Sequence, residues 1–182
     1  MITMCMLIDE TSAPPLRAHI TRLLACSTAS DIAVGSIRLA GLDLTAADVR
    51  SVRRCRILIG RLDASALVDL GRDSRAPNAR METLLDFLKS GRVQVRSAGI
   101  GAWSPDFSLY HRAAPGESAC LVGAHYFHEP LSSHGPSFTV LLTDPAAVTT
   151  AAARFERLWR RSHDVIEPVI GAIRQRQSFC AL

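Results

Sequence analysis

The chain has 182 residues, of which 48% are hydrophobic and 21% are charged, so it is long and apolar enough to fold as one domain over 1–182 and too apolar to be disordered. No apolar run reaches the roughly 18 residues that a membrane span needs, and the first residues lack a signal-like apolar core. We therefore expect a cytoplasmic protein without a membrane segment. The formal net charge is +4 and Lys89 is the only lysine. This arginine bias suits phosphate contacts, but a GC-rich genome would produce the same bias, and that is the interpretation that we favour.

The first half of the chain alternates between helical and strand patterns. Apolar residues recur at helical spacing after Pro14 and Pro15, and short apolar runs rich in β-branched residues follow at two places, which is typical of buried strands. The predicted elements are a helix over 16–29, a strand over 31–37, a short helix over 45–53, a strand over 55–60, a brief helix over 63–70 and a helix over 78–90.

After Gly91 the apolar period changes to two, which is typical of half-buried strands. The predicted strands are 92–96, 106–112, 119–123 and 137–142, with the middle two forming a hairpin. Asp144 and Pro145 then begin a long helix, and 166–176 continues as a second helix or a bent extension. Helices and strands that alternate before a series of strands predict an α/β domain, in which a mixed β-sheet is flanked by helices on both faces.

The order of these elements resembles one half-domain of the phospholipase D superfamily. The resemblance covers about residues 16–162, and 163–182 would be a C-terminal helical extension. Its most specific parts are the spacing of FSLY (107–110) to CLVGAHYF (120–127), and the helix that begins at Asp144 and carries Phe155 and Trp159.

The resemblance also implies that the catalytic residues are missing. An active member carries H-x-K on the first hairpin strand and a Gly-Ser-x-Asn-like turn after the second, because His forms a phosphohistidine while Lys and Asn hold the phosphoryl oxygens. The best alignment places Asp106 at the His position and Ser108 at the Lys position. The turn keeps Gly123 but has Ala124 at the Ser position and Tyr126 nearest the Asn position. This pattern predicts a catalytically degraded protein that acts as a binding or assembly subunit, on nucleic acid or with a protein partner.

Two other functions stay open. A phosphodiesterase or nuclease could use a rearranged site built from His111, His125 and His128. Strand alternation turns His111 away from Asp106 and Ser108, so we interpret it as a residue at the rim of the hairpin. The third function is that of a purely structural subunit. We expect no cofactor and no metal, because two histidines without a third ligand and cysteines without a C-x-x-C pair do not make a zinc site.

Two surfaces are predicted to make contacts. The first is a candidate phosphate-binding surface, although an ordinary solvated helix end accounts for most of this cluster. Its residues are Arg50, Arg53, Arg54 and Arg56. The second is a homodimer interface in the region 103–128, since superfamily half-domains pack about a two-fold axis and this chain has the length of one half. A lone half would leave aromatic side chains partly exposed there, namely Trp103, Phe107, Tyr110, Tyr126 and Phe127. Such an interface would bury about 1,600 Å² or more in total.

Overall fold

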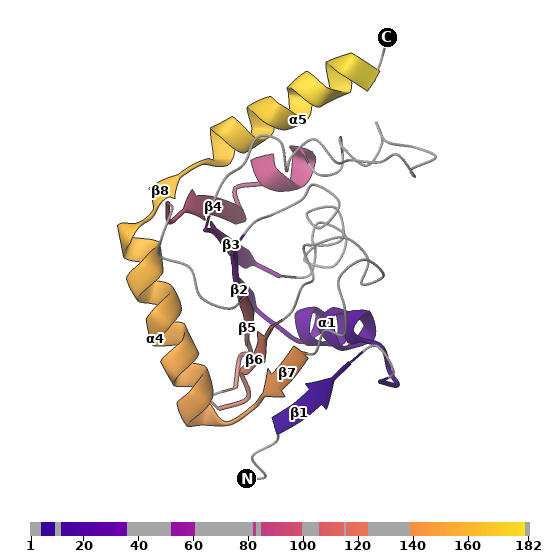
Figure 1. Cartoon of the computed structure of the whole chain (residues 1–182), viewed down its shortest axis with the longest axis vertical. Coiled ribbons are helices and arrows are strands. Elements are labelled where there is room, and N and C mark those ends of the chain that lie inside the picture. The colour runs from indigo at the N-terminus through magenta and orange to yellow at the C-terminus, as the bar shows by residue number, and fades with distance from the viewer. Residues whose placement is uncertain are drawn as a thin grey trace.

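The computed structural model describes residues 5–9, 12–35, 52–60, 82, 85–99, 106–114, 116–123 and 139–180. Within these residues, one eight-stranded mixed sheet has the strand order β1-β7-β6-β5-β2-β3-β4-β8 and runs through the middle of the molecule (Figure 1). The strands are β1 (Cys5–Ile8), β2 (Ala29–Val34), β3 (Arg54–Ile59), β4 (Val93–Ser97), β5 (Phe107–His111), β6 (Ala119–Val122), β7 (Thr139–Leu142) and β8 (His163–Asp164).

The centre of the sheet is parallel and its margins are antiparallel. β2 pairs with β3 and β3 with β4 in parallel, whereas β5 runs antiparallel to β2. As a consequence, β2, β3 and β4 begin on the side of the sheet on which β5 ends. By an edge we mean such a side, made of strand ends, and not an outermost strand. We call this side the amino edge, and we call the opposite side, where β5 begins, the carboxyl edge.

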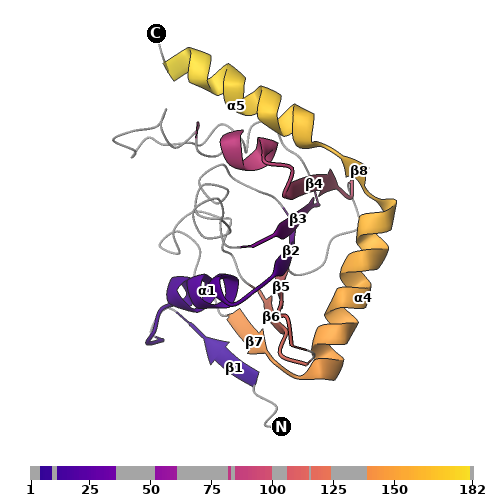
Figure 2. The ribbon, with the colours of Figure 1, turned by 180° about the vertical axis from the view of Figure 1, so that it is seen from behind.

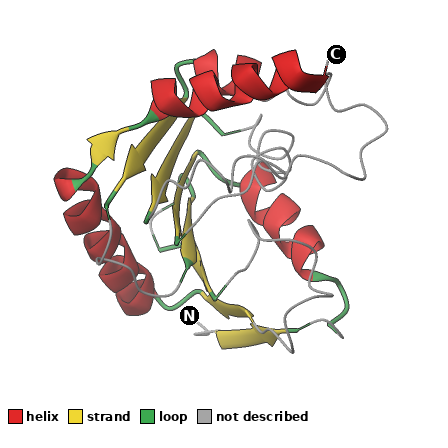
Figure 3. Ribbon diagram, turned by 45° about the horizontal axis from the view of Figure 1, so that its top comes forward, coloured by secondary structure: helices red, strands yellow, loops and turns green. Residues whose placement is uncertain are grey.

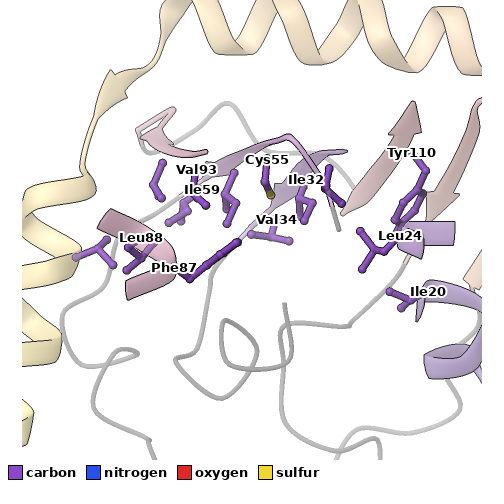
Figure 4. Close-up of a cluster of buried hydrophobic side chains, with 14 of the residues drawn as sticks. Ile20, Leu24, Ile32, Val34, Cys55, Ile59, Phe87, Leu88, Val93 and Tyr110 are labelled. Atoms are coloured by element: carbon purple, nitrogen blue, oxygen red, sulfur yellow. The ribbon is translucent and has the colours of Figure 1, made fainter. Parts of the chain in front are cut away.

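Helices lie on both faces of the sheet, as the sequence predicts (Figures 1 and 2). The described helices are α1 (Leu16–Ala25), α4 (Pro145–Arg161) and α5 (Ile166–Cys180). α1, α5 and the helical segment 85–89 pack on one face, where Leu24, Phe87 and Tyr110 belong to one large apolar cluster (Figure 4). α4 covers the opposite face with Val148, Phe155 and Trp159 (Figure 3).

The observed elements differ from the predicted ones mainly at their ends. The first helix ends at Ala25 rather than near Ala29, because Ala29 already pairs in β2. β1 and β8 were not predicted, since four and two residues are too few to show a period. Arg53, predicted at the end of a helix, instead precedes β3 and donates its main-chain N–H to the Thr28 carbonyl oxygen at 3.0 Å. The rest of the predicted helix before Val52 and the predicted helix over 63–70 lie outside the described residues.

One expectation about the aromatic residues is wrong. Phe107 and Tyr110 are buried within the single chain, because Phe107 packs edge-on against Phe155 with ring centroids 6.4 Å apart and Tyr110 lies in the cluster under α1 and α5. The other aromatic positions predicted for a dimer interface, Trp103, Tyr126 and Phe127, lie outside the described residues.

Candidate functional site

The degenerate motif lies at the carboxyl edge of the sheet. Asp106 directly precedes β5, and its Oδ1 accepts a hydrogen bond from the Gly35 N–H at 2.7 Å. The Asp106 carbonyl oxygen accepts another from the Gly123 N–H at 2.8 Å. Gly123 has φ 81°, a left-handed conformation that favours glycine at this turn. The structure therefore brings the predicted positions Asp106 and Gly123 together.

Ser108 completes the described part of the motif, and it is buried in the sheet between Ile32 of β2 and Leu121 of β6. The carboxylate of Asp106 is held by a main-chain N–H and Ser108 carries no positive charge, so these two positions offer neither a nucleophile nor a cation for a phosphodiester. Four further candidates lie outside the described residues, namely Ala124, His125, Tyr126 and His128.

A second group of polar side chains is buried under α4. Asp31 and Arg56 are register neighbours in the parallel strands β2 and β3. Arg56 donates from Nε to Asp31 Oδ1 and from Nη2 to Asp31 Oδ2, both at 2.6 Å, which is the bidentate geometry of a strong pair. Nη2 also donates to Oε1 of Glu156 on α4 at 2.6 Å. The guanidinium lies 4.8 Å from the ring centroid of Phe155 and 5.2 Å from that of Trp159.

His111, at the end of β5, joins this network. Its Nε2 lies 2.7 Å from Asp31 Oδ2, and the His111 side chain is 29% exposed while that of Asp31 is 3% exposed. Burial by itself would raise the pKa of the Asp31 carboxyl, but the hydrogen bonds with Arg56 and His111 outweigh burial and lower that pKa. Burial opposes the charge of Arg56 as well, yet the bonds to Asp31 and Glu156 raise the pKa of its guanidinium. Asp31 and Arg56 are therefore an ionised, hydrogen-bonded pair.

The buried thiols near these groups are not reactive. Burial, together with the nearby Asp31 charge, raises the pKa of Cys55 to about 12. Burial raises the pKa of Cys120 to about 12 also. Since the thiolate is the nucleophilic form, neither side chain offers a nucleophile at neutral pH.

The predicted site residues thus separate into two places. His111 and Asp106 are at opposite ends of β5, about 16 Å apart for five residues of extended chain, so His111 does not join the degenerate motif. Arg56 is a phosphate candidate in the sequence, but its side chain is only 10% exposed and is bound to carboxylates. Arg53 and Arg54 are exposed at the amino edge, whereas Arg50 lies outside the described residues.

Sequence reasoning missed Asp31 and Glu156. A signal for Asp31 was present, because a charged residue rarely enters an apolar strand unless it is paired. The run around Asp31 and the run around Arg56 each contain one buried charge, of opposite sign. No comparable signal marks Glu156 among the polar residues of α4.

Comparison with known proteins gives matches by structure alone. No family model and no curated protein sequence matches the chain. The phospholipase D family member Nuc from Salmonella typhimurium superposes with a TM-score of 0.58 at 11% identity, over 90% of this chain and 98% of that one. The chain has the phospholipase D fold.

Two further structures with this fold are similar. NucT from Helicobacter pylori has a TM-score of 0.58 at 9% identity, over 90% of this chain and 99% of that one. TrmBL2, an archaeal chromatin protein with a novel mode of DNA binding, has a TM-score of 0.54 at 14% identity, over 88% of this chain and 54% of that one. The phospholipase D fold therefore extends over about nine tenths of this chain.

Proposed function

We propose that this phospholipase D-like chain is a catalytically inactive subunit that binds nucleic acid. One observation carries the proposal. At the head of β5, the position of the family's nucleophile, stands Asp106, whose carboxylate is occupied by the Gly35 N–H.

The physical chemistry of Asp106 argues against phosphodiester cleavage. A carboxylate repels an anionic phosphodiester by about 1 kcal/mol at 4 Å even in water. The buried Ser108 supplies no cation to offset that repulsion or to hold the phosphoryl oxygens. At the described positions Asp106 and Ser108, the chain thus lacks the charges that the family reaction uses.

Binding to nucleic acid is supported by charge and by similarity. The chain carries a formal net charge of +4 with a pI of about 9.1, which favours a polyanionic partner. A protein of similar fold, TrmBL2, is described as a chromatin protein that binds DNA.

We further propose that the protein is a cytoplasmic homodimer with its interface in the region 103–128. No described helix is both long and apolar enough to cross a membrane. A dimer of half-domains places the two carboxyl edges together, as the family resemblance implies.

An assay of cleavage and binding tests this function. Purified protein is incubated with duplex DNA, RNA and an activated phosphodiester, and we expect no product above the buffer background. In parallel, binding to a fluorescent duplex should weaken linearly with the logarithm of salt concentration, because counterions are released from the DNA.

Two outcomes would contradict the proposal. His111 is held by Asp31, an arrangement that can support a general base, and turnover that His111→Ala abolishes would establish the alternative of a phosphodiesterase. An absence of binding to DNA, RNA or protein partners would favour the purely structural subunit.

A further inference from the structure

The amino edge of the sheet gathers basic side chains from neighbouring strands. Main-chain hydrogen bonds tie the strand ends together: the Thr28 N–H donates to the His111 carbonyl oxygen at 2.8 Å, and the Arg53 N–H donates to the Thr28 carbonyl oxygen at 3.0 Å. The Cys55 N–H donates to the Arg92 carbonyl oxygen at 2.8 Å. We define the basic edge as the arginines at these strand ends, Arg53, Arg54, Arg92 and Arg112.

The positive charge of Arg54, one of the basic-edge arginines, is only partly compensated by the buried carboxylate near it. Arg54 Nη2 lies 3.9 Å from Asp31 Oδ1 and its side chain is 52% exposed, but Asp31 is already bound by Arg56 and His111. Glu156 on α4 is bound by Arg56 as well. The charge of Arg54 is consequently available to a ligand from solvent.

Arg112 provides an independent indication. Its Nε is buried and has no hydrogen-bond partner among the described residues, and an unpaired buried donor costs about 1–3 kcal/mol. Glu117, a carboxylate of the same hairpin, lies exposed in the turn between β5 and β6. It does not accept a hydrogen bond from the buried Arg112 Nε. An anion bound beside Arg112 would add a favourable charge interaction for a guanidinium that is not fully satisfied within the chain.

The dimensions of the basic edge suit a duplex backbone. Strands lie about 4.8 Å apart, so the step from β5 across β2 and β3 to β4 spans about 14 Å. One DNA strand rises about 3.4 Å along the helix axis for each phosphate, so the basic edge lies along roughly four base steps of a duplex.

The edge suits duplex DNA better than single strands. Single-stranded nucleic acid is bound by exposed aromatic side chains on which bases stack. Among the described residues, the exposed large apolar side chain is Leu7, which lies on β1 at the margin of the sheet. The described part of the basic edge therefore offers charge without a stacking surface.

We propose that the basic edge binds the phosphate backbone of duplex DNA, at the edge of the sheet opposite to the degenerate motif. This inference rests on the proposed nucleic-acid function and assigns it to a surface. The arginines stand on the ends of paired strands, so their backbones are already ordered and each guanidinium can bind a phosphate by its two-pronged geometry. Contacts of this kind position a protein on DNA without reading its sequence.

The experiment compares arginine variants with a matched control. Arg54→Gln and Arg112→Gln remove one charge each from the basic edge. Arg154→Gln removes one charge from an exposed position of α4; because Arg154 precedes Phe155 while Glu156 follows it, Arg154 lies on the flank of α4 that points away from the amino edge. Thermal unfolding of each variant checks that the fold is intact.

We expect each basic-edge variant to bind a random-sequence duplex several-fold more weakly and to flatten the log-log salt slope by about 0.9. Arg154→Gln should retain the wild-type slope. If the wild type binds duplex DNA and the basic-edge variants keep its slope, the surface assignment is overturned while the proposed function stands. If the wild type binds neither duplex DNA, single strands nor RNA at low salt, the nucleic-acid function itself fails. Stronger binding to single strands than to duplex would overturn the choice of partner.

Discussion

At the scale of single residues, the pair between Asp31 and Arg56 holds two charges inside the sheet. Removing a charge from water is costly, and a buried pair is stable only when its hydrogen bonds are complete. Here Asp31 receives hydrogen bonds from Arg56 and lies 2.7 Å from His111 Nε2, while the spare donor of Arg56 reaches Glu156. Removing one member of the pair should therefore lower the free energy of unfolding by more than the intact pair contributes to it.

We predict that Asp31→Asn lowers the free energy of unfolding by about 3–5 kcal/mol near neutral pH, because it leaves Arg56 buried with an incomplete partner. Because folding lowers the pKa of Asp31 below its ordinary 3.8, its stabilisation is present above that value and is lost as the pH falls through the folded pKa. Urea unfolding at about pH 7 and at about pH 3 should show the difference from wild type narrowing in acid.

Glu156→Gln is the matched control for this prediction. Glu156 accepts from the same guanidinium nitrogen at the same 2.6 Å, but its side chain is 41% exposed, so water screens the pair and we expect a loss of about 1 kcal/mol or less. If both variants lose the same free energy of unfolding, burial is not the reason that the Asp31 carboxylate stabilises the fold.

At the scale of elements, the start of α4 sets where the helix lies on the sheet. The Asp144 side chain accepts the Ala147 N–H at 2.8 Å, and Pro145 occupies the first turn. At the other end, Arg96 Nη1 donates to the Trp159 carbonyl oxygen at 3.2 Å and its guanidinium lies 4.8 Å from the Trp159 ring centroid. Both ends of α4 are thereby fixed.

We predict that Asp144→Ala lowers the free energy of unfolding by about 0.5–2 kcal/mol, because an N–H of the first turn loses its acceptor. Asp144→Ser should retain most of the stability, since a hydroxyl oxygen can accept the same bond. Urea unfolding of the three proteins measures the difference. An Asp144→Ser protein as unstable as Asp144→Ala would show that the capping bond is not what stabilises this end.

The elements also show which parts of the fold could be predicted from the sequence. The strands β3 to β7 and the helices α1 and α4 follow from apolar periods and capping residues, because these signals are local. The pair of Asp31 and Arg56 depends on the register between β2 and β3, and the contact with Glu156 depends on where α4 crosses the sheet. Both are tertiary properties, so Arg56 remained a phosphate candidate in the sequence even though the opposite charge of Asp31 is visible in another apolar run.

At the scale of the whole molecule, the two edges of the sheet are suited to different contacts. The six residues of β2 separate the amino edge from the carboxyl edge by about 20 Å. A homodimer joined at its carboxyl edges, near Asp106 and Gly123, would leave both basic edges free on the outside, including Arg112 at the other end of the 103–128 region. Two binding surfaces in one particle raise the apparent affinity for a ligand that can reach both.

We predict a homodimer that binds long duplexes more tightly than short ones. Light scattering at micromolar concentration should give twice the 19.7 kDa of one chain, and Tyr126→Arg or Phe127→Arg, in the predicted interface, should give a monomer. The matched control Arg54→Gln should remain dimeric, because its position is at the amino edge.

Measurements of DNA binding then distinguish the effect of dimerisation from the effect of the basic-edge contacts. The monomeric variants should keep wild-type affinity for a short duplex that occupies one basic edge and lose the gain for a long one. Arg54→Gln should weaken binding to both lengths. A wild-type chain that scatters as a monomer at every concentration, or a dimer that Tyr126→Arg and Phe127→Arg leave intact, would exclude the 103–128 region as the interface and with it the bivalent arrangement of the basic edges.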